Sequence, residues 1–188
     1  MRAAIFLLLL LVLVGCGQEQ TVLEPMQQLE VPTDSLSIQG YGASWPYYSQ
    51  GYRNTLLLSV GYQDLGKYGG ACKIWVQNLV KRVTDGRVVV PANVTSTGAL
   101  RYLWQNDPAG HVVGQCLDIS SVQPGQVVQM AWGTSSLHTF LLAGRNSSGM
   151  YWLDSNWYKD GKVKYHFVAN SWFNALPNLR YSVYTIGW

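Results

Sequence analysis

Apolar residues recur along residues 72–83 with the spacing of a helix that buries one side against a core. They occupy positions 72, 75, 76, 79, 80 and 83, so that neighbouring members of the stripe are one, three or four positions apart. The basic and amide side chains of the segment fall off this stripe, and Asp85-Gly86 follows it as a stop signal. The pattern predicts an amphipathic helix over 72–83 with Cys72 in its first turn.

A second short helix is predicted over residues 54–65, and glycines at positions 66, 69 and 70 end it and open a turn. Its expected buried residues are Leu56, Leu57, Val60 and Leu65. Upstream, residues 41–52 are rich in Tyr, Ser and Gly. The Trp45-Pro46 pair predicts that no regular element forms there, because proline restricts the residue before it.

The second half of the chain consists of short apolar runs bounded by Gly, Asn or Pro, which is typical of strands. Strands are predicted over residues 127–132, 139–143, 150–154, 164–168 and 181–186. Residues 144–149, Gly-Arg-Asn-Ser-Ser-Gly, are turn formers and predict a hairpin loop. Because the helix precedes a run of strands, the fold class predicted is α+β, with the helix that carries the cysteine packed on an antiparallel sheet.

The register of this hairpin decides which residues lie close to His138. If residues 144–149 close it, His138 lies opposite Asp154 or Asn156, and directly facing residues have Cβ atoms about 5 Å apart. The even-numbered positions of the two strands share one face of the sheet. We expect the helix of Cys72 to pack on that same face and to complete a group of three.

These residue types form a recognisable chemical set. A thiol at a helix N-terminus is biased toward the thiolate, because unpaired backbone N–H groups and the helix dipole favour an anion. A histidine supplies a base, and a carboxylate or amide can orient it. Cys72, His138 and one of Asp154 or Asn156 therefore predict a cysteine hydrolase.

The same residues also permit a structural interpretation. Free cysteines are often buried and inert, and an Asp-Ser-Asn run is common in turns. Cys72 and Cys116 are the two cysteines that remain beyond Cys16. In an extracytoplasmic protein such a pair could form a disulfide, which would cap the proposed nucleophile.

The N-terminus has the pattern of an export signal. Met1-Arg2 precedes an unbroken apolar run over residues 3–14, which is too short for a permanent membrane span. The ending Leu-Val-Gly-Cys at residues 13–16 resembles the bacterial lipobox, in which the cysteine is lipidated. We therefore expect a signal peptide over 1–15, lipidation at Cys16 and a membrane-anchored, extracytoplasmic lipoprotein. A plain cleaved signal or an uncleaved anchor is the alternative.

Residues 16–40 contain no sustained period and are expected to be a flexible tether. Residues 41–188 are expected to form one domain, and no internal repeat is present. The chain has 13 basic and 10 acidic residues, a balance that does not favour a nucleic-acid partner. Its 8 Trp and 12 Tyr are numerous, and some could line a groove for sugars or peptides.

The three histidines, His111, His138 and His166, show no close metal-ligand spacing, so no metal and no other cofactor is expected.

Four segments resemble the CHAP family, the cysteine, histidine-dependent amidohydrolases/peptidases. They occur in the family's order, between about residue 54 and residue 188, at 69–76, 123–130, 137–142 and 152–157. The resemblance implies a papain-like fold and cleavage of amide bonds in peptidoglycan, as an amidase or an endopeptidase. It also implies a peptidoglycan or peptide substrate, beside the membrane that the lipid anchor would contact.

Carried over by position, the resemblance makes Cys72 the nucleophile and His138 the base, with Asp154 and Asn156 competing for the orienting role. Two positions depart from the family. Ala71 stands where members often have Gln, and Asp154 stands where Glu is more common. Two other functions share the fold: a non-catalytic wall-binding lipoprotein, and an enzyme of the same mechanism that acts on a protein.

Overall fold

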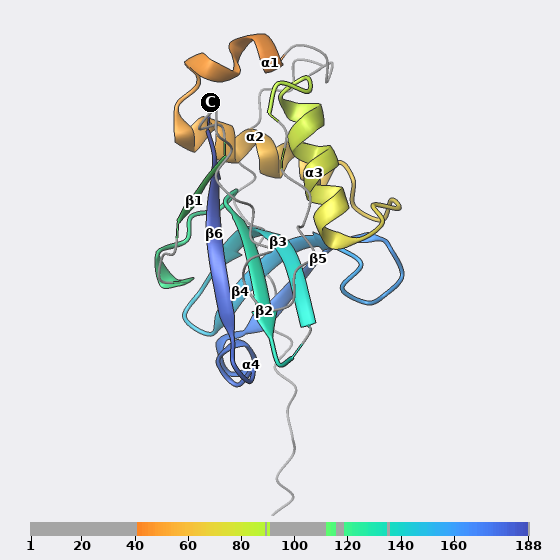
Figure 1. The fold of residues 1–188 in the computed structure, drawn as a ribbon, viewed down its shortest axis with the longest axis vertical. Helices are drawn as coiled ribbons and strands as arrows, with labels where there is room; N and C mark the ends of the chain where they lie inside the picture. The colour runs from red at the N-terminus through yellow and green to blue at the C-terminus, as the bar shows by residue number, and fades with distance from the viewer. Residues whose placement is uncertain (1–40, 89, 91–111, 116–118, 135, 188) are drawn as a thin grey trace, which may run out of the picture. The chain divides into compact units, whose positions relative to one another are not determined.

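An antiparallel sheet of six strands is the centre of the structure, with the strand order β1-β6-β2-β3-β4-β5 (Figure 1). The computed structural model describes residues 41–88, 90, 112–115, 119–134 and 136–187. In chain order the elements are α1 (Tyr41–Ser44), η1 (Trp45–Tyr47), α2 (Gln50–Tyr62), α3 (Cys72–Val83), β1 (Val112–Gln115), η3 (Ile119–Ser121), β2 (Val127–Trp132), β3 (Ser136–Arg145), β4 (Gly149–Ser155), β5 (Val163–Ala169), α4 (Asn170–Asn174) and β6 (Arg180–Ile186). The predicted α+β class is confirmed.

The four strands β2 to β5 form a meander in which each strand pairs with the next. β6 then returns beside β2, and β1 pairs with the outer side of β6. Every pairing is antiparallel. β3 is therefore a central strand, and His138 lies near its beginning.

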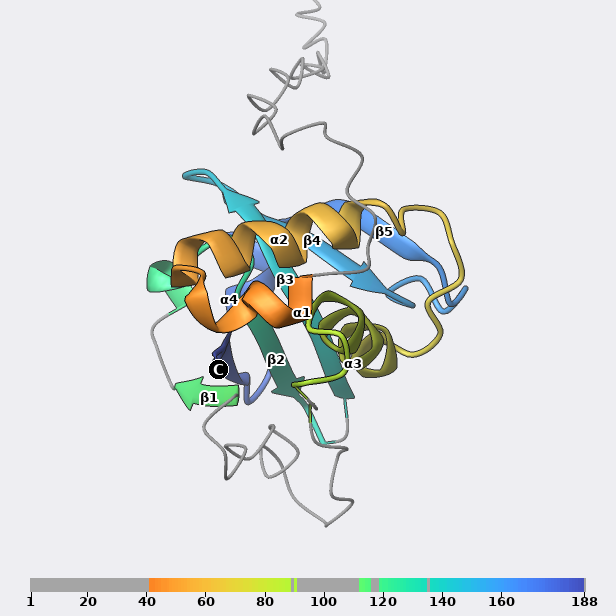
Figure 2. The same ribbon diagram turned by 90° about the horizontal axis from the view of Figure 1, so that it is seen from above.

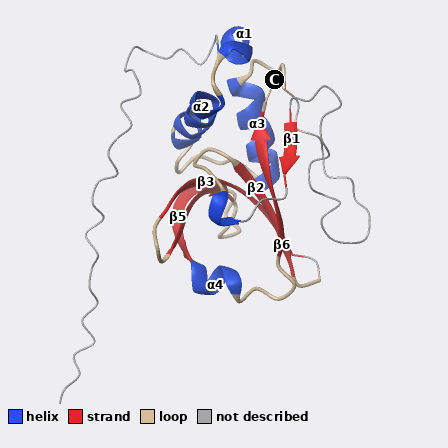
Figure 3. Cartoon of the chain, turned by 90° about the vertical axis from the view of Figure 1, so that its left-hand side faces the viewer, coloured by secondary structure: helices blue, strands red, loops and turns tan. Residues whose placement is uncertain are grey.

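The sheet buries apolar side chains on both faces. One face, which includes Leu141 and Leu153, packs against the first three helices. The opposite face, which includes Phe140 and Trp152, packs against Phe173 of α4. Figure 3 shows α1 to α3 on one side of the sheet and α4 on the other, and Figure 2 looks down on the first three helices across the strands.

The helix predicted over 72–83 is confirmed with the same bounds as α3. Trp75, Val76, Leu79, Val80 and Val83 are buried along its stripe. The second helix lies earlier than predicted, because Ser49 accepts a hydrogen bond from the Tyr52 N–H and caps the helix start. Leu65 falls beyond its end and is 44% exposed, so its predicted burial was wrong.

The expectation that residues 41–52 lack regular structure was also wrong. Pro46 lies in the first turn of η1, where a missing N–H costs nothing. Trp45 is fully buried, and its indole N–H donates to the carbonyl of Gly187, a residue 142 positions later in the chain.

The predicted strands are confirmed within a few residues, and the hairpin of β3 and β4 is present. Its loop is shorter than predicted, because Gly144 and Arg145 continue β3 and Gly149 begins β4. The side chain of Asn146 closes the turn by accepting the N–H groups of Ser148 and Gly149. The sequence pattern also missed β1, η3 and α4.

The predictions for the signal peptide, for Cys16 and for the tether fall on residues 1–40, outside the described part of the chain. Cys116 and His111 also lie outside it. Among the described helices, none has both the length and the apolar character needed to cross a membrane.

Candidate active site

Cys72 is the first residue of α3, and the segment before it is tied to the sheet. The N–H groups of Gly69 and Gly70 both donate to the carbonyl of Gly161 (2.7 and 3.0 Å). The hydroxyl of Ser155, at the end of β4, donates to the carbonyl of Gly70 (2.7 Å). A Cβ at Gly69 would lie only 2.7 Å from that hydroxyl oxygen, so the close approach requires glycine. These contacts hold the start of α3 beside the end of β4.

His138 and Asp154 form a buried pair across the hairpin. Nε2 of His138 lies 3.0 Å from Oδ2 of Asp154, and the two residues are 5% and 0% exposed. The two residues do not face each other directly. Asp154 is paired with Phe140, and its side chain reaches diagonally to His138, two residues earlier on β3.

The expectation that α3 packs on the His138 face of the sheet was wrong. α3 packs on the opposite face, against Leu141 and Leu153. Cys72 still reaches the pair because the pairing of β3 with β4 ends at Phe140 and Asp154. Just beyond that point, the backbone N–H of Thr139 donates to the Cys72 sulfur, which is also hydrogen-bonded to His138.

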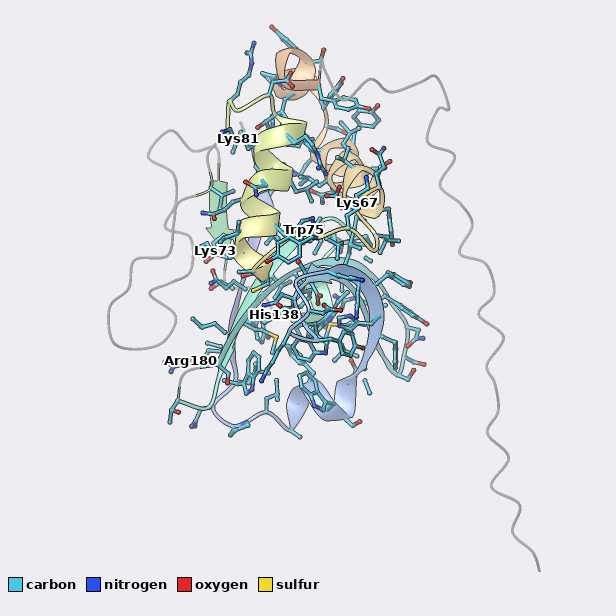
Figure 4. The ribbon with its side chains drawn as sticks, turned by 90° about the vertical axis from the view of Figure 1, so that its right-hand side faces the viewer. Lys67, Lys73, Trp75, Lys81, His138 and Arg180 are labelled. Carbon is cyan, nitrogen blue, oxygen red and sulfur yellow. The ribbon has the colours of Figure 1, made fainter. Side chains whose placement is uncertain are left out.

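Figure 4 shows His138 below the end of α3 that carries Lys73. Since Nε2 of His138 faces Asp154, the other ring nitrogen, Nδ1, is the one that remains for the thiol. Cys72 is a free cysteine in the structure and is partly exposed. The three residues thus form a line in which the sulfur lies at the accessible end and the carboxylate at the buried end.

The electrostatics of this line favour an ion pair. Burial raises the pKa of the Cys72 thiol, but the hydrogen bond and charge of His138, with the backbone N–H groups of Thr139 and Lys73, outweigh it and leave the pKa below its ordinary value. Burial lowers the pKa of His138, but its hydrogen bonds to Asp154 and Cys72 and their charges raise it to about 9. Both shifts favour the thiolate–imidazolium pair over the neutral thiol and imidazole.

Asn156, the alternative partner for His138, has a different role. Its backbone has a positive φ of 66°, which asparagine tolerates better than most residues. Its Oδ1 accepts the N–H of Gly161, and its backbone N–H donates to Lys162. Asn156 therefore shapes the turn that presents Gly161 to the segment before Cys72, and Asp154 is the residue on the imidazole.

Aromatic rings surround the imidazole. Trp157 contacts His138 edge to face at 4.8 Å between ring centroids, and Phe140 and Trp152 stack near it. Such rings exclude water and strengthen the charge interactions of the buried pair. Trp157 was not predicted as a site residue, although it follows Asp154 by three positions in the chain.

Lys73 and His166 also lie beside the site, and neither was predicted as a site residue. Lys73 follows the nucleophile and is buried, and burial lowers its pKa to about 8 although the nearby Cys72 opposes the shift. His166 on β5 lies with Nε2 3.5 Å from Oδ2 of Asp154. Within the described residues, no three His, Cys, Asp or Glu side chains are placed to hold a metal ion.

No protein-family model and no curated protein matches the sequence. The structure is similar to the crystal structure of Ly7917, with a TM-score of 0.51 and 13% identity over 69% of this chain and 61% of that chain. It is also similar to the crystal structure of Ly7917 with the hydrolyzing product of MDP, with a TM-score of 0.51 and 10% identity over 74% of this chain and 64% of that chain. The chain thus spans less than two thirds of either structure. At this identity the likeness concerns the fold alone, and it agrees with a papain-like fold.

Proposed function

We propose that this chain is a CHAP-type cysteine hydrolase of the cell envelope that cleaves amide bonds in peptidoglycan, as an amidase or an endopeptidase. The observation that carries the proposal is the contact of Cys72 with His138 and of His138 with the buried Asp154. Ly7917 supports the substrate class, because one of its crystal structures contains the hydrolyzing product of MDP, a peptidoglycan fragment.

The reaction begins from the thiolate and the imidazolium. The Cys72 thiolate attacks the amide carbonyl carbon, and the carbonyl π electrons move onto its oxygen. The backbone N–H of Cys72 has no acceptor within its own helix and donates to that oxyanion. His138 then protonates the leaving amine from Nδ1, the C–N bond breaks, and a thioester remains on Cys72.

Water completes the cycle. Neutral His138 takes a proton from a water molecule, and the resulting hydroxide attacks the thioester carbonyl and displaces the Cys72 thiolate. Asp154 stabilises the imidazolium in both halves of the reaction, because its carboxylate stays on Nε2. Ala71 supplies no side-chain donor to the oxyanion, so the backbone N–H of Cys72 is the donor that this segment contributes.

Digestion of purified peptidoglycan by the full chain tests the proposal. The wild type should release fragments with new amine ends, and Cys72→Ala should release none, because the alanine side chain has no nucleophile. The measurement is mass analysis of the released fragments, which also identifies the bond. Cys116→Ala is the matched control and should cleave like the wild type.

Each other outcome favours a different function. Release of the same fragments by Cys72→Ala would contradict the cysteine mechanism. Sedimentation of the protein with peptidoglycan, with no fragments from any variant, would favour a wall-binding lipoprotein. Cysteine-dependent cleavage of a protein but not of peptidoglycan would keep the mechanism and change the substrate.

We also propose that Cys16 carries a lipid that anchors the protein to a membrane. The motivation is the apolar run that ends in Leu-Val-Gly-Cys. Cys16→Ser should lose incorporation of a labelled fatty acid and should move from the membrane to the soluble fraction, whereas Cys116→Ser should do neither. Retained label and retained membrane association in Cys16→Ser would refute the anchor.

A further inference from the structure

His166 lies on the same diagonal of the sheet as His138 and Asp154. Asp154 on β4 pairs with Phe140 on one side and with Lys164 on the other. His138 is two residues before Phe140, and His166 is two residues after Lys164. The two histidines therefore flank the carboxylate from opposite strands, on the face of the sheet that α4 covers.

The polar atoms of this group are incompletely paired. Oδ2 of Asp154 lies 3.0 Å from Nε2 of His138 and 3.5 Å from Nε2 of His166. Among the described residues, Oδ1 of Asp154 and both ring nitrogens of His166 are buried without a formed hydrogen bond. Buried polar atoms are usually paired, because an unpaired one costs about 1–3 kcal/mol. A closure of about 0.5 Å would bring His166 and Asp154 to hydrogen-bond distance.

The ring of His166 has little freedom to turn elsewhere. Trp157 stacks beside it at 5.7 Å between centroids, Trp152 lies at 5.8 Å and Tyr158 at 5.7 Å. Its side chain is 10% exposed. The aromatic rings therefore keep the imidazole against Asp154.

The imidazole of His166 is neutral at pH 7 and can donate its single ring N–H. Burial lowers the pKa of His166, Asp154 opposes this, and the positive charges of His138 and Lys164 lower it further. These are the charged groups that face it from β3, β4 and β5, and the hydroxyl-bearing ring of Tyr158 lies beside it. One imidazole next to Asp154 is thus protonated and the other is neutral.

We propose that His166 is a positioning residue, whose Nε2–H donates to Oδ2 of Asp154 and holds this carboxylate against His138. An oxygen of a carboxylate has two lone pairs and can accept from both imidazoles. The effect reaches Cys72 through His138, because a held carboxylate stabilises the imidazolium that pairs with the thiolate. The inference rests on the proposed cysteine mechanism and on no particular substrate.

Alkylation of Cys72 by iodoacetamide in the full chain, measured from pH 4 to pH 9, tests the proposal without a substrate. His166→Phe keeps a ring but removes the donor, and it should move the midpoint of the rate profile about one pH unit higher, which is about tenfold slower alkylation at pH values below both midpoints. His166→Gln is the matched variant, because its amide N–H can replace Nε2–H. It should stay within about twofold of the wild type at pH 6.

A purely structural role would lower the melting temperature of both variants and leave the midpoint unchanged, and this result would overturn the proposal. Equal midpoints in His166→Phe and His166→Gln would also overturn it. If His166→Phe does not fold, ¹⁵N NMR of the wild type decides, since the proposal requires a neutral His166 protonated on Nε2 at pH 7. A midpoint that depends on His166, in a protein that leaves peptidoglycan intact, would support this inference and refute the proposed substrate.

Discussion

Replacement of His138 with alanine should lower the rate of peptidoglycan cleavage by about 1,000-fold or more. The variant loses the partner that keeps Cys72 ionised and the acid that protonates the leaving amine. Initial rates of fragment release measure the effect. Leu137→Ala is a suitable control, because Leu137 is adjacent in the chain and its side chain is 40% exposed, and this variant should cleave like the wild type.

Alkylation of Cys72 in the same variant needs no substrate, so it measures the loss of His138 separately from any damage to a substrate-binding site. In the wild type, the Cys72 pKa lies below its ordinary value and the His138 pKa is about 9, and both shifts favour the reactive thiolate at mildly acidic pH. In His138→Ala the thiolate should form only near the ordinary cysteine pKa of about 8.5. Alkylation at pH 6 should therefore fall more than tenfold. Alkylation that is indifferent to His138 would contradict the catalytic interpretation.

Replacement of Asp154 with alanine should destabilise the domain by about 3–5 kcal/mol at pH 6, because it leaves the imidazolium of His138 buried without its carboxylate. The pKa of His138 is about 9 in the folded protein and about 6.5 in the unfolded chain. The stabilisation from this pair is thus fully present below pH 6.5 and is lost as the pH rises through about 9. Urea unfolding of both proteins at pH 6 and pH 9.5 measures the difference.

Asp160→Ala is the control for loss of a carboxylate. Asp160 pairs with Lys164 four residues later on the exposed edge of the domain, and such pairs contribute little to folding. A cost in Asp154→Ala no larger than in this control, or a cost that grows between pH 6 and pH 9.5, would contradict the assigned ion pair.

The sequence predicted α3 and the proximity of His138 and Asp154 well, and the reasons are local. The bounds of α3 follow from a 3.6-residue apolar period and a Gly stop, which depend on no distant contact. The hairpin of β3 and β4 follows from its turn residues, and it brings His138 near Asp154. Neither inference needed the sheet order.

The errors came from features that local patterns do not encode. A helix stripe shows which side of α3 is buried, but both faces of this sheet are apolar, so the pattern could not say which face α3 covers. The register of the hairpin shifts between Leu142 and Gly144, where the strand pairing is irregular. A count from the loop therefore could not separate a facing from a diagonal placement of Asp154.

His166 was missed for a related reason. Its place depends on the register of β4 against β5, which the turn between residues 156 and 162 sets. Asn156, Lys159 and Gly161 in this turn all have positive φ, and apolar periodicity does not reveal such a turn. Knowledge of the β4–β5 register alone would have put a second histidine beside Asp154.

The distances along the chain between the site residues imply an order for their assembly during folding. His138 and Asp154 are 16 residues apart and joined by one hairpin, so their contact needs only local chain closure. Cys72 joins them after α3 docks and the N–H groups of Gly69 and Gly70 bond to Gly161, contacts between segments distant in sequence. A partly folded chain therefore carries a mostly protonated, unreactive thiol. The nucleophile therefore becomes reactive only after this long-range docking, which protects the partly folded chain from premature alkylation or oxidation.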